Sequence, residues 1–174
     1  MRAGTGVIGA LLFAAACSSG RPNDASRAEL RSPQGFVSDF YAWYVPLANG
    51  DQKGPAWHLV LQQRASALAP ELSAALTRDT AAQSAVVGQI AGLDFDPFLN
   101  SQDPCPRYEA GDAVQQEQGY SVEVYGVCGD KRNATPDVIV ELASASDSWA
   151  IVNIRYPGNE TDLLAVLGRL RVSH

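Results

Sequence analysis

A short run of oxygen-bearing side chains is the sharpest candidate for chemistry in this sequence. Residues 92–106 read GLDFDPFLNSQDPCP and contain Asp94, Asp96, Asn100 and Asp103. Carboxylate and amide oxygens at such short spacing could hold Ca²⁺, but the glycine and the distal glutamate of an EF-hand loop are missing at the required offsets. Asx side chains also cap turns and helix ends. We therefore expect structural capping, with a binding surface or a metal site as alternatives.

Signatures of catalysis are sparse. The sequence has two histidines, His58 and His174. An isomerase or dehydratase site commonly needs a histidine or carboxylate base together with donors for the developing oxyanion. His58 follows Trp57, which favours a partly buried surface histidine over a base. No nucleophile elbow, P-loop, zinc-protease or dinucleotide motif occurs. We assign no catalytic residue and no cofactor, and favour a protein that is not an enzyme, with an enzyme as the alternative.

Aromatic residues gather in a predicted helix that starts at Ser32-Pro33, where serine can cap and proline suits the first turn. Apolar residues follow at helical spacing, and we expect Pro46 to end the helix at Val45. Tyr41 and Trp43 could line an apolar pocket, although such residues more often form plain core. The members of the apolar stripe are Phe36, Val37, Phe40, Tyr41, Trp43, Tyr44 and Leu47.

The three cysteines divide into one near the start of the chain and two in its second half. Cys105 and Cys128 lack metal-site spacing, since no C-x-x-C and no nearby histidine exists. In an oxidising compartment such a pair forms a disulfide by default. Closing the loop would stabilise the fold by roughly 3 kcal/mol. Two buried free thiols are the alternative.

The first 17 residues, MRAGTGVIGALLFAAAC, have the pattern of an export signal. The apolar run of residues 6–16 follows a short positive start and is too short to span about 30 Å of hydrocarbon. The ending resembles a lipobox with Ala14 in place of the usual leucine, which predicts lipidation of Cys17. The same small residues also satisfy the A-x-A rule, so a soluble secreted form stays open. A lipid on Cys17 accounts for the odd cysteine.

The net charge and the predicted N-terminal lipid limit the kinds of partner that this protein can bind. The net charge of −6 argues against nucleic acid and against electrostatic docking on anionic lipid. Attachment to a membrane is therefore expected through the N-terminal lipid. Ser18, rather than aspartate, follows Cys17, which predicts the periplasmic face of the outer membrane.

The remaining elements change from helical to alternating patterns along the chain. Helices are expected around residues 57–68 and from Pro70 to about Val87, and a final helix follows residue 161. Strands are expected at 119–128, 138–143 and 149–156, with 107–116 as a fourth. Helices first and strands later predict an α+β fold. We divide the chain into a signal peptide (1–16), a flexible tether (17–32) and one domain (33–174).

Three stretches resemble the bacterial family called domain of unknown function 3828. They are FVSDFYAWY at 36–44, LDFDPFLNSQDPC at 93–105 and YSVEVYG at 120–126. The resemblance covers about residues 33–171 and implies an envelope protein that is often lipid-anchored. It also implies an NTF2-like or cystatin-like fold, in which helices rest in a curved antiparallel sheet of about four strands. The aromatic helix would then point Phe36, Phe40 and Tyr44 into the concave face.

Three classes of function fit these observations. The first is a non-catalytic envelope module that binds a protein or a cell-wall component, as an immunity protein or an enzyme inhibitor does. The second is a small-molecule binder or enzyme that uses an NTF2-like pocket. The third is a structural lipoprotein. An enclosed cavity with an ionisable group would favour the second class, whereas a filled core with an acidic face would favour the first.

Overall fold

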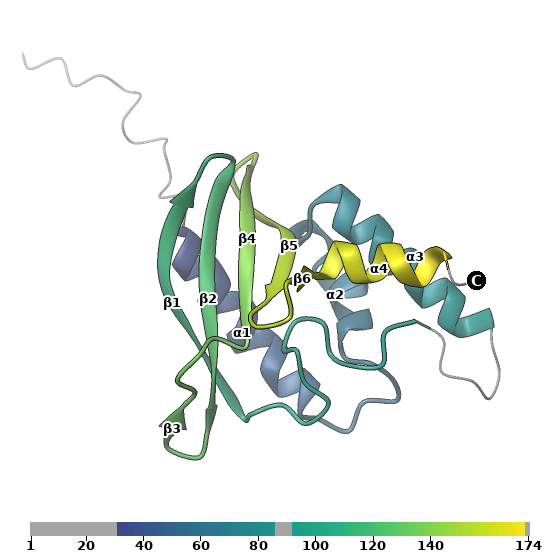
Figure 1. Ribbon diagram of the computed structural model, residues 1–174, viewed down its shortest axis with the longest axis horizontal. Helices are drawn as coiled ribbons and strands as arrows, with labels where there is room; N and C mark the ends of the chain where they lie inside the picture. The colour runs from purple at the N-terminus through teal and green to yellow at the C-terminus, as the bar shows by residue number, and fades with distance from the viewer. Residues whose placement is uncertain (1–30, 86–91, 173–174) are drawn as a thin grey trace, which may run out of the picture.

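An antiparallel sheet dominates the second half of the chain in the computed structural model, which describes residues 31–85 and 92–172 (Figure 1). The sheet order is β1-β2-β4-β5-β6, and β3 pairs with the end of β2. The predicted α+β class with a C-terminal helix is confirmed. The strands are β1 (Arg107–Gln116), β2 (Gly119–Cys128), β3 (Lys131–Arg132), β4 (Val138–Ala145), β5 (Ser148–Tyr156) and β6 (Thr161–Asp162).

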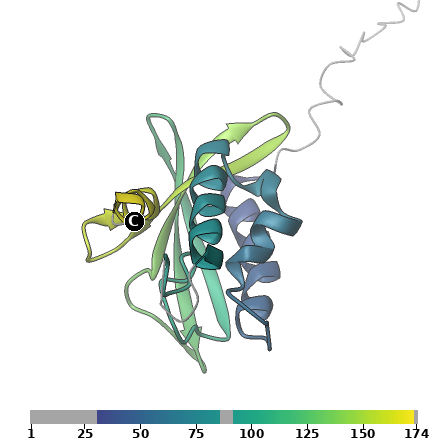
Figure 2. The same cartoon turned by 90° about the vertical axis from the view of Figure 1, so that its right-hand side faces the viewer.

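The helices come mainly before the sheet in sequence. With the sheet seen edge-on, α1, α2 and α3 lie on one side of it (Figure 2). The C-terminal helix α4 packs against α3 and β5. Their bounds are α1 (Pro33–Ala48), α2 (Trp57–Gln63), the single 3₁₀ turn η1 (Ala65–Ala67), α3 (Pro70–Ala85) and α4 (Leu163–Val172). No helix within the described ranges is long and apolar enough to cross a membrane.

Helix α1 begins where the sequence predicts, because the Ser32 hydroxyl accepts a 3.0 Å hydrogen bond from the Gly35 amide. The predicted end at Val45 is wrong. Pro46 lies inside the last turn, and the helix continues to Ala48. Asn49 explains the extension, since its backbone N–H and its side-chain amide both donate to the Val45 carbonyl, at 3.0 and 3.1 Å. The Val45 carbonyl, directly before the proline, therefore has two donors at the end of the helix.

Helix α1, which carries the aromatic stripe, packs against one face of the sheet. Phe40 is 1% exposed and Tyr44 is fully buried, while Phe36 is partly buried at the edge of the core. Phe40 and Tyr44 stack with ring centroids 5.6 Å apart. Phe40 and Tyr44 belong to one core with the inward-facing residues of three strands. Little space for a ligand therefore remains between α1 and the sheet. Those strand residues are Val122, Val124, Val138, Val140 and Ile151.

The end of the second predicted helix differs from the sequence prediction. Leu68 was expected in the second helix but is extended and forms a bridge with Ile151 of β5. Pro70 accounts for the change, because it disfavours helix at Ala69, whose N–H donates instead to the Ile151 carbonyl at 2.8 Å. The predicted extension of the third helix to Val87 falls beyond Ala85, outside the described residues.

Candidate functional site

The segment 92–106, here called the Asp-rich loop, is fixed at its end by a disulfide. Cys105 and Cys128 are bonded with their Cα atoms 4.9 Å apart, as predicted. The bond joins the end of the loop to the end of β2. Asn49 also donates from its side-chain amide to the Cys105 carbonyl at 3.2 Å. The loop is thereby tied to both the sheet and the end of α1.

Asp96 caps the turn in the middle of this loop. Its Oδ1 accepts hydrogen bonds from the amides of Phe98 and Leu99, at 2.9 and 3.1 Å. Its Oδ2 accepts a 2.5 Å hydrogen bond from the Tyr44 hydroxyl. One carboxylate therefore organises the loop locally and connects it to α1.

Two further tyrosines hold the same turn from the core side. The Tyr41 hydroxyl donates to the Phe98 carbonyl at 2.7 Å, and the Tyr156 hydroxyl donates to the Pro97 carbonyl at 3.1 Å. Tyr41 and Tyr156 are 2% and 3% exposed. Buried carbonyls in an irregular segment need such donors, so the tyrosines replace the hydrogen bonds that a regular element would supply.

The other predicted site residues have separate positions. Asn100 has a positive φ of 51° and donates from its side chain to the Asp137 carbonyl at 3.2 Å. Asp94 and Asp103 are exposed. Trp43 lies under the Arg64 guanidinium, which is 4.5 Å from the ring centroid. No group of three or more metal-ligating side chains is found in residues 31–85 and 92–172.

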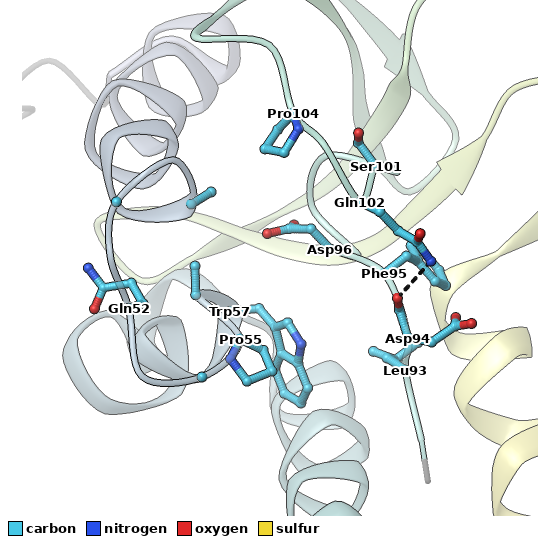
Figure 3. Close-up of a pocket in the computed structure, with 14 residues that line it drawn as sticks. Gln52, Pro55, Trp57, Leu93, Asp94, Phe95, Asp96, Ser101, Gln102 and Pro104 are labelled. Carbon is cyan, nitrogen blue, oxygen red and sulfur yellow. Dashed lines mark hydrogen bonds between the residues drawn. The ribbon is translucent and has the colours of Figure 1, made fainter. Parts of the chain in front are cut away.

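An open hollow of about 560 Å³ lies between the Asp-rich loop and the segment that follows α1. One wall comes from residues 48–57 and the other from residues 93–104 (Figure 3). Asp94 and Asp96 line it, and Figure 3 shows the Asp96 carboxylate directed between the walls and the Asp94 carboxylate turned away. Asn100, Asp103, Tyr41 and Trp43 are not among its lining residues.

Sequence reasoning missed the opposite wall of the hollow. Residues 49–55, NGDQKGP, look like an ordinary connection, and Trp57 looks like a helix core residue. The available signal was a large aromatic directly after a loop rich in glycine and polar residues. Such loops often carry binding residues.

Burial controls the electrostatics of Asp96. Burial raises the pKa of the Asp96 carboxyl to about 6, although the hydrogen bonds from Tyr44, Phe98 and Leu99 oppose the increase. Burial, followed by the charge of Asp96, raises the pKa of Tyr44 far above its usual value, so Tyr44 remains a hydrogen-bond donor. None of the ion pairs in the described part of the chain involves Asp96. At neutral pH Asp96 is thus an anion that has no cationic partner among the residues that the structure describes.

Trp57 brings a second unsatisfied group to the hollow. It is 1% exposed, and its indole N–H has no hydrogen-bond partner among the described residues. The neighbouring His58 packs edge-on against it, with ring centroids 4.1 Å apart. Burial lowers the pKa of His58, so this histidine is neutral at pH 7. Buried polar groups normally have partners, so the Trp57 N–H and the Nε2 of His58, which is also buried without a partner in the described residues, are exceptions that need an explanation.

Comparisons with known proteins inform the fold. No family model and no curated protein sequence matches the chain. Two solved structures do match, both of the type VI effector–immunity complex Tae3–Tai3 from Ralstonia pickettii. A chain of the native complex is 22% identical, with a TM-score of 0.54, over 75% of this chain and 99% of that chain. The selenomethionine form gives 22% identity and a TM-score of 0.50, over 75% and 100%. The chain shares the fold of its counterpart in that complex.

Proposed function

We propose that this chain is a non-catalytic binding module of the cell envelope that binds a protein partner, as an immunity protein or enzyme inhibitor does. The observation that carries the proposal is the Asp-rich loop. The disulfide, Asp96 and three tyrosine hydroxyls hold this irregular loop. Asp94, Gln102 and Asp103 remain exposed on it. A loop that is already ordered loses little conformational entropy on binding.

Fold and charge support a protein partner. The matched solved chains belong to an effector–immunity complex, in which two proteins bind each other. This chain has a net charge of −6. An acidic surface accelerates encounter with a basic protein by electrostatic steering. Together these observations favour a basic effector or enzyme as the partner.

A small-molecule binder is the second candidate, and the hollow is the observation that favours it. Its volume of about 560 Å³ lies within the range of ligand sites, and Asp96 supplies an ionisable group. However, the hollow is open to solvent and lies outside the sheet, whose interior is filled by Phe40 and Tyr44. Ligand sites usually enclose most of the ligand surface, so we rank this candidate below a protein partner.

The envelope location is part of the proposal. Residues 1–30 lie outside the described residues, so lipidation of Cys17 depends on the sequence pattern. The Cys105–Cys128 disulfide supports an oxidising compartment. Mass spectrometry of the N-terminus should show a diacylated cysteine at position 17. A free amino terminus on Ser18, or an unmodified Cys17 in the medium, would instead indicate a different fate for the chain.

Protection of cells tests the binding role. Type VI effectors that stop growth when exported, with Tae3 from Ralstonia pickettii included in the set, are each co-expressed with the full chain. We expect the chain to restore growth against at least one of them. The purified pair should bind with a Kd of about 1 μM or lower in calorimetry. Failure to protect against or bind any of these effectors contradicts the proposal.

A matched pair of charge reversals localises the contact. Asp103→Lys, on the Asp-rich loop, should weaken binding at least tenfold. Glu117→Lys makes the same charge change in the turn between β1 and β2, at the other end of the sheet (Figure 1), and should change the Kd less than twofold. Equal effects of the two variants would show that only net charge matters.

A further inference from the structure

We propose that the hollow receives a lysine or arginine side chain from the protein partner, with Asp96 as its counter-ion and the Trp57 indole N–H as a donor to the adjoining main-chain carbonyl. This inference rests on the proposed function and names the chemistry of its contact. Two groups that the fold leaves incomplete, an anion and a donor, lie in the same hollow. A basic residue of a polypeptide supplies the complement of both.

The charge of the walls favours a cation. The described residues that line the hollow include no lysine or arginine, and of their two acidic residues Asp96 directs its carboxylate between the walls. Lys53 belongs to the facing segment but is exposed and does not line the hollow. Asp96 already accepts hydrogen bonds at both oxygens, yet these donors are neutral. A cation entering the hollow would therefore meet an anion that no basic group in residues 31–85 and 92–172 compensates.

Trp57 is the second and independent observation. Its buried indole N–H lies on the wall opposite Asp96, and its nitrogen edge faces the side of Leu93 and Asp94 (Figure 3). An unpaired buried donor costs about 1–3 kcal/mol, which a ligand acceptor would recover. A free metal ion offers no acceptor, whereas a peptide segment brings a carbonyl with every residue.

The apolar parts of the walls suit a long side chain. Pro55 and Pro104 face each other across the opening (Figure 3). Lysine and arginine bury their methylene stems along apolar surface while the charged head reaches a polar group. The Gln102 side chain is already engaged, since it donates to the Asp94 carbonyl at 3.1 Å. Asp96 carries the carboxylate that is directed between the walls, and it therefore supplies the charged acceptor for that head.

Ionisation of Asp96 makes the contact sensitive to pH. The surrounding hydroxyls of Tyr41, Tyr44 and Tyr156 have raised pKa values and remain neutral, and His58 beside Trp57 has a lowered pKa. The carboxylate of Asp94 points away from the hollow. With the Asp96 pKa at about 6, binding of a cation should be about tenfold weaker at pH 5 than at pH 7.5.

Nuclear magnetic resonance on the full chain tests the proposal directly. The chain has three tryptophans, so Trp57→Phe assigns the Trp57 indole signal. The probes are the capped peptide Gly-Arg-Gly and its neutral counterpart Gly-Gln-Gly. We expect the arginine peptide to shift the Trp57 signal saturably, and the glutamine peptide to bind at least tenfold more weakly. Asp96→Asn should weaken the arginine peptide at least fivefold, and the matched Asp94→Asn less than twofold.

Other outcomes overturn the inference and separate it from the proposed function. Absence of a Trp57 shift, or equal binding of both peptides, rules out a site for a basic side chain. A shift produced by N-acetylglucosamine in place of the arginine peptide would assign the hollow to a sugar. If an effector binds the chain and Asp96→Asn leaves its Kd unchanged, the inference fails while the proposed function stands. If the arginine peptide binds but no effector does, the proposed function fails.

Discussion

Tyr44 and Asp96 are 52 residues apart in sequence, and the tyrosine hydroxyl donates a 2.5 Å hydrogen bond to the carboxylate. Tyr44 belongs to the core, whereas Asp96 lines the hollow. This hydrogen bond therefore connects the hydrophobic core to the candidate site. Changes on either side of it should be measurable as stability and as binding.

Removal of the Tyr44 hydroxyl should destabilise the folded protein. Tyr44→Phe leaves a partly buried carboxylate oxygen without its donor, so the free energy of unfolding at pH 7.5 should fall by about 1.5–3 kcal/mol. Tyr41→Phe is the matched control, because it removes a hydrogen bond to a neutral carbonyl and should cost about 0.5–1.5 kcal/mol. Urea denaturation measures both, and a larger loss for Tyr41→Phe would contradict this ranking.

The free energy of unfolding should depend on pH through the ionisation of Asp96. Folding raises the pKa of this carboxyl from 3.8 to about 6, so its contribution to stability is full below about pH 4 and is lost as the pH rises through 6. Asp96→Asn removes that dependence. The unfolding free energy of the wild type relative to the variant should fall by about 1–3 kcal/mol between pH 4 and pH 7.5. If the difference in unfolding free energy between the wild type and the variant is constant with pH, burial does not raise the pKa of Asp96.

The disulfide should stabilise the domain as well as the loop. Its two cysteines are separated by 23 residues, for which the chain-entropy model gives about 3 kcal/mol. The double variant Cys105→Ser/Cys128→Ser should lose about 2–5 kcal/mol in chemical denaturation, and a reductant should have the same effect on the wild type. A reductant that lowers the stability of the double variant equally would assign the effect to something other than this bond.

Phe40 should be among the most sensitive core positions. It is 1% exposed and contacts the rings of Tyr41, Tyr44 and Phe98, so Phe40→Ala should lower the unfolding free energy by about 3–5 kcal/mol. Phe36→Ala, one turn earlier at a partly buried position, should cost less. Thermal melts of the two variants provide the comparison, and an unchanged melting temperature for Phe40→Ala would remove this helix from the core.

Local patterns were sufficient for the main elements of this fold, although they misplaced the ends of α1 and α2 and did not predict the two-residue strands β3 and β6. The apolar spacing of α1 predicts a helix that carries Phe40 and Tyr44 inward, and alternation predicts β2 through Val122 and Val124. The number of cysteines, their lack of metal-site spacing and the export signal together led to the disulfide. Each of these signals lies within a few residues of the feature that it predicts, or depends on a count.

The hollow could not be predicted in the same way, because its walls come from separate loops. Asp79 illustrates the difficulty: an acidic residue in an alanine-rich helix looks exposed, yet it is 6% exposed and accepts the Leu93 amide at 3.2 Å. Gly92 permits this approach, since a Cβ there would lie 2.6 Å from an oxygen of Asp79. Contacts between distant segments decide such positions, and local sequence does not encode them.

Helix α1 also separates the hollow from the N-terminal segment of the chain. Its 16 residues span about 24 Å, with Pro33 at one end and Ala48, which lines the hollow, at the other. The start of the helix adjoins the segment that leads back to Cys17. If Cys17 carries a lipid, α1 acts as a spacer that keeps the opening on the far side of the domain from its attachment point. A partner bound at the opening would then lie about a helix length away from the residue at which the chain continues toward Cys17.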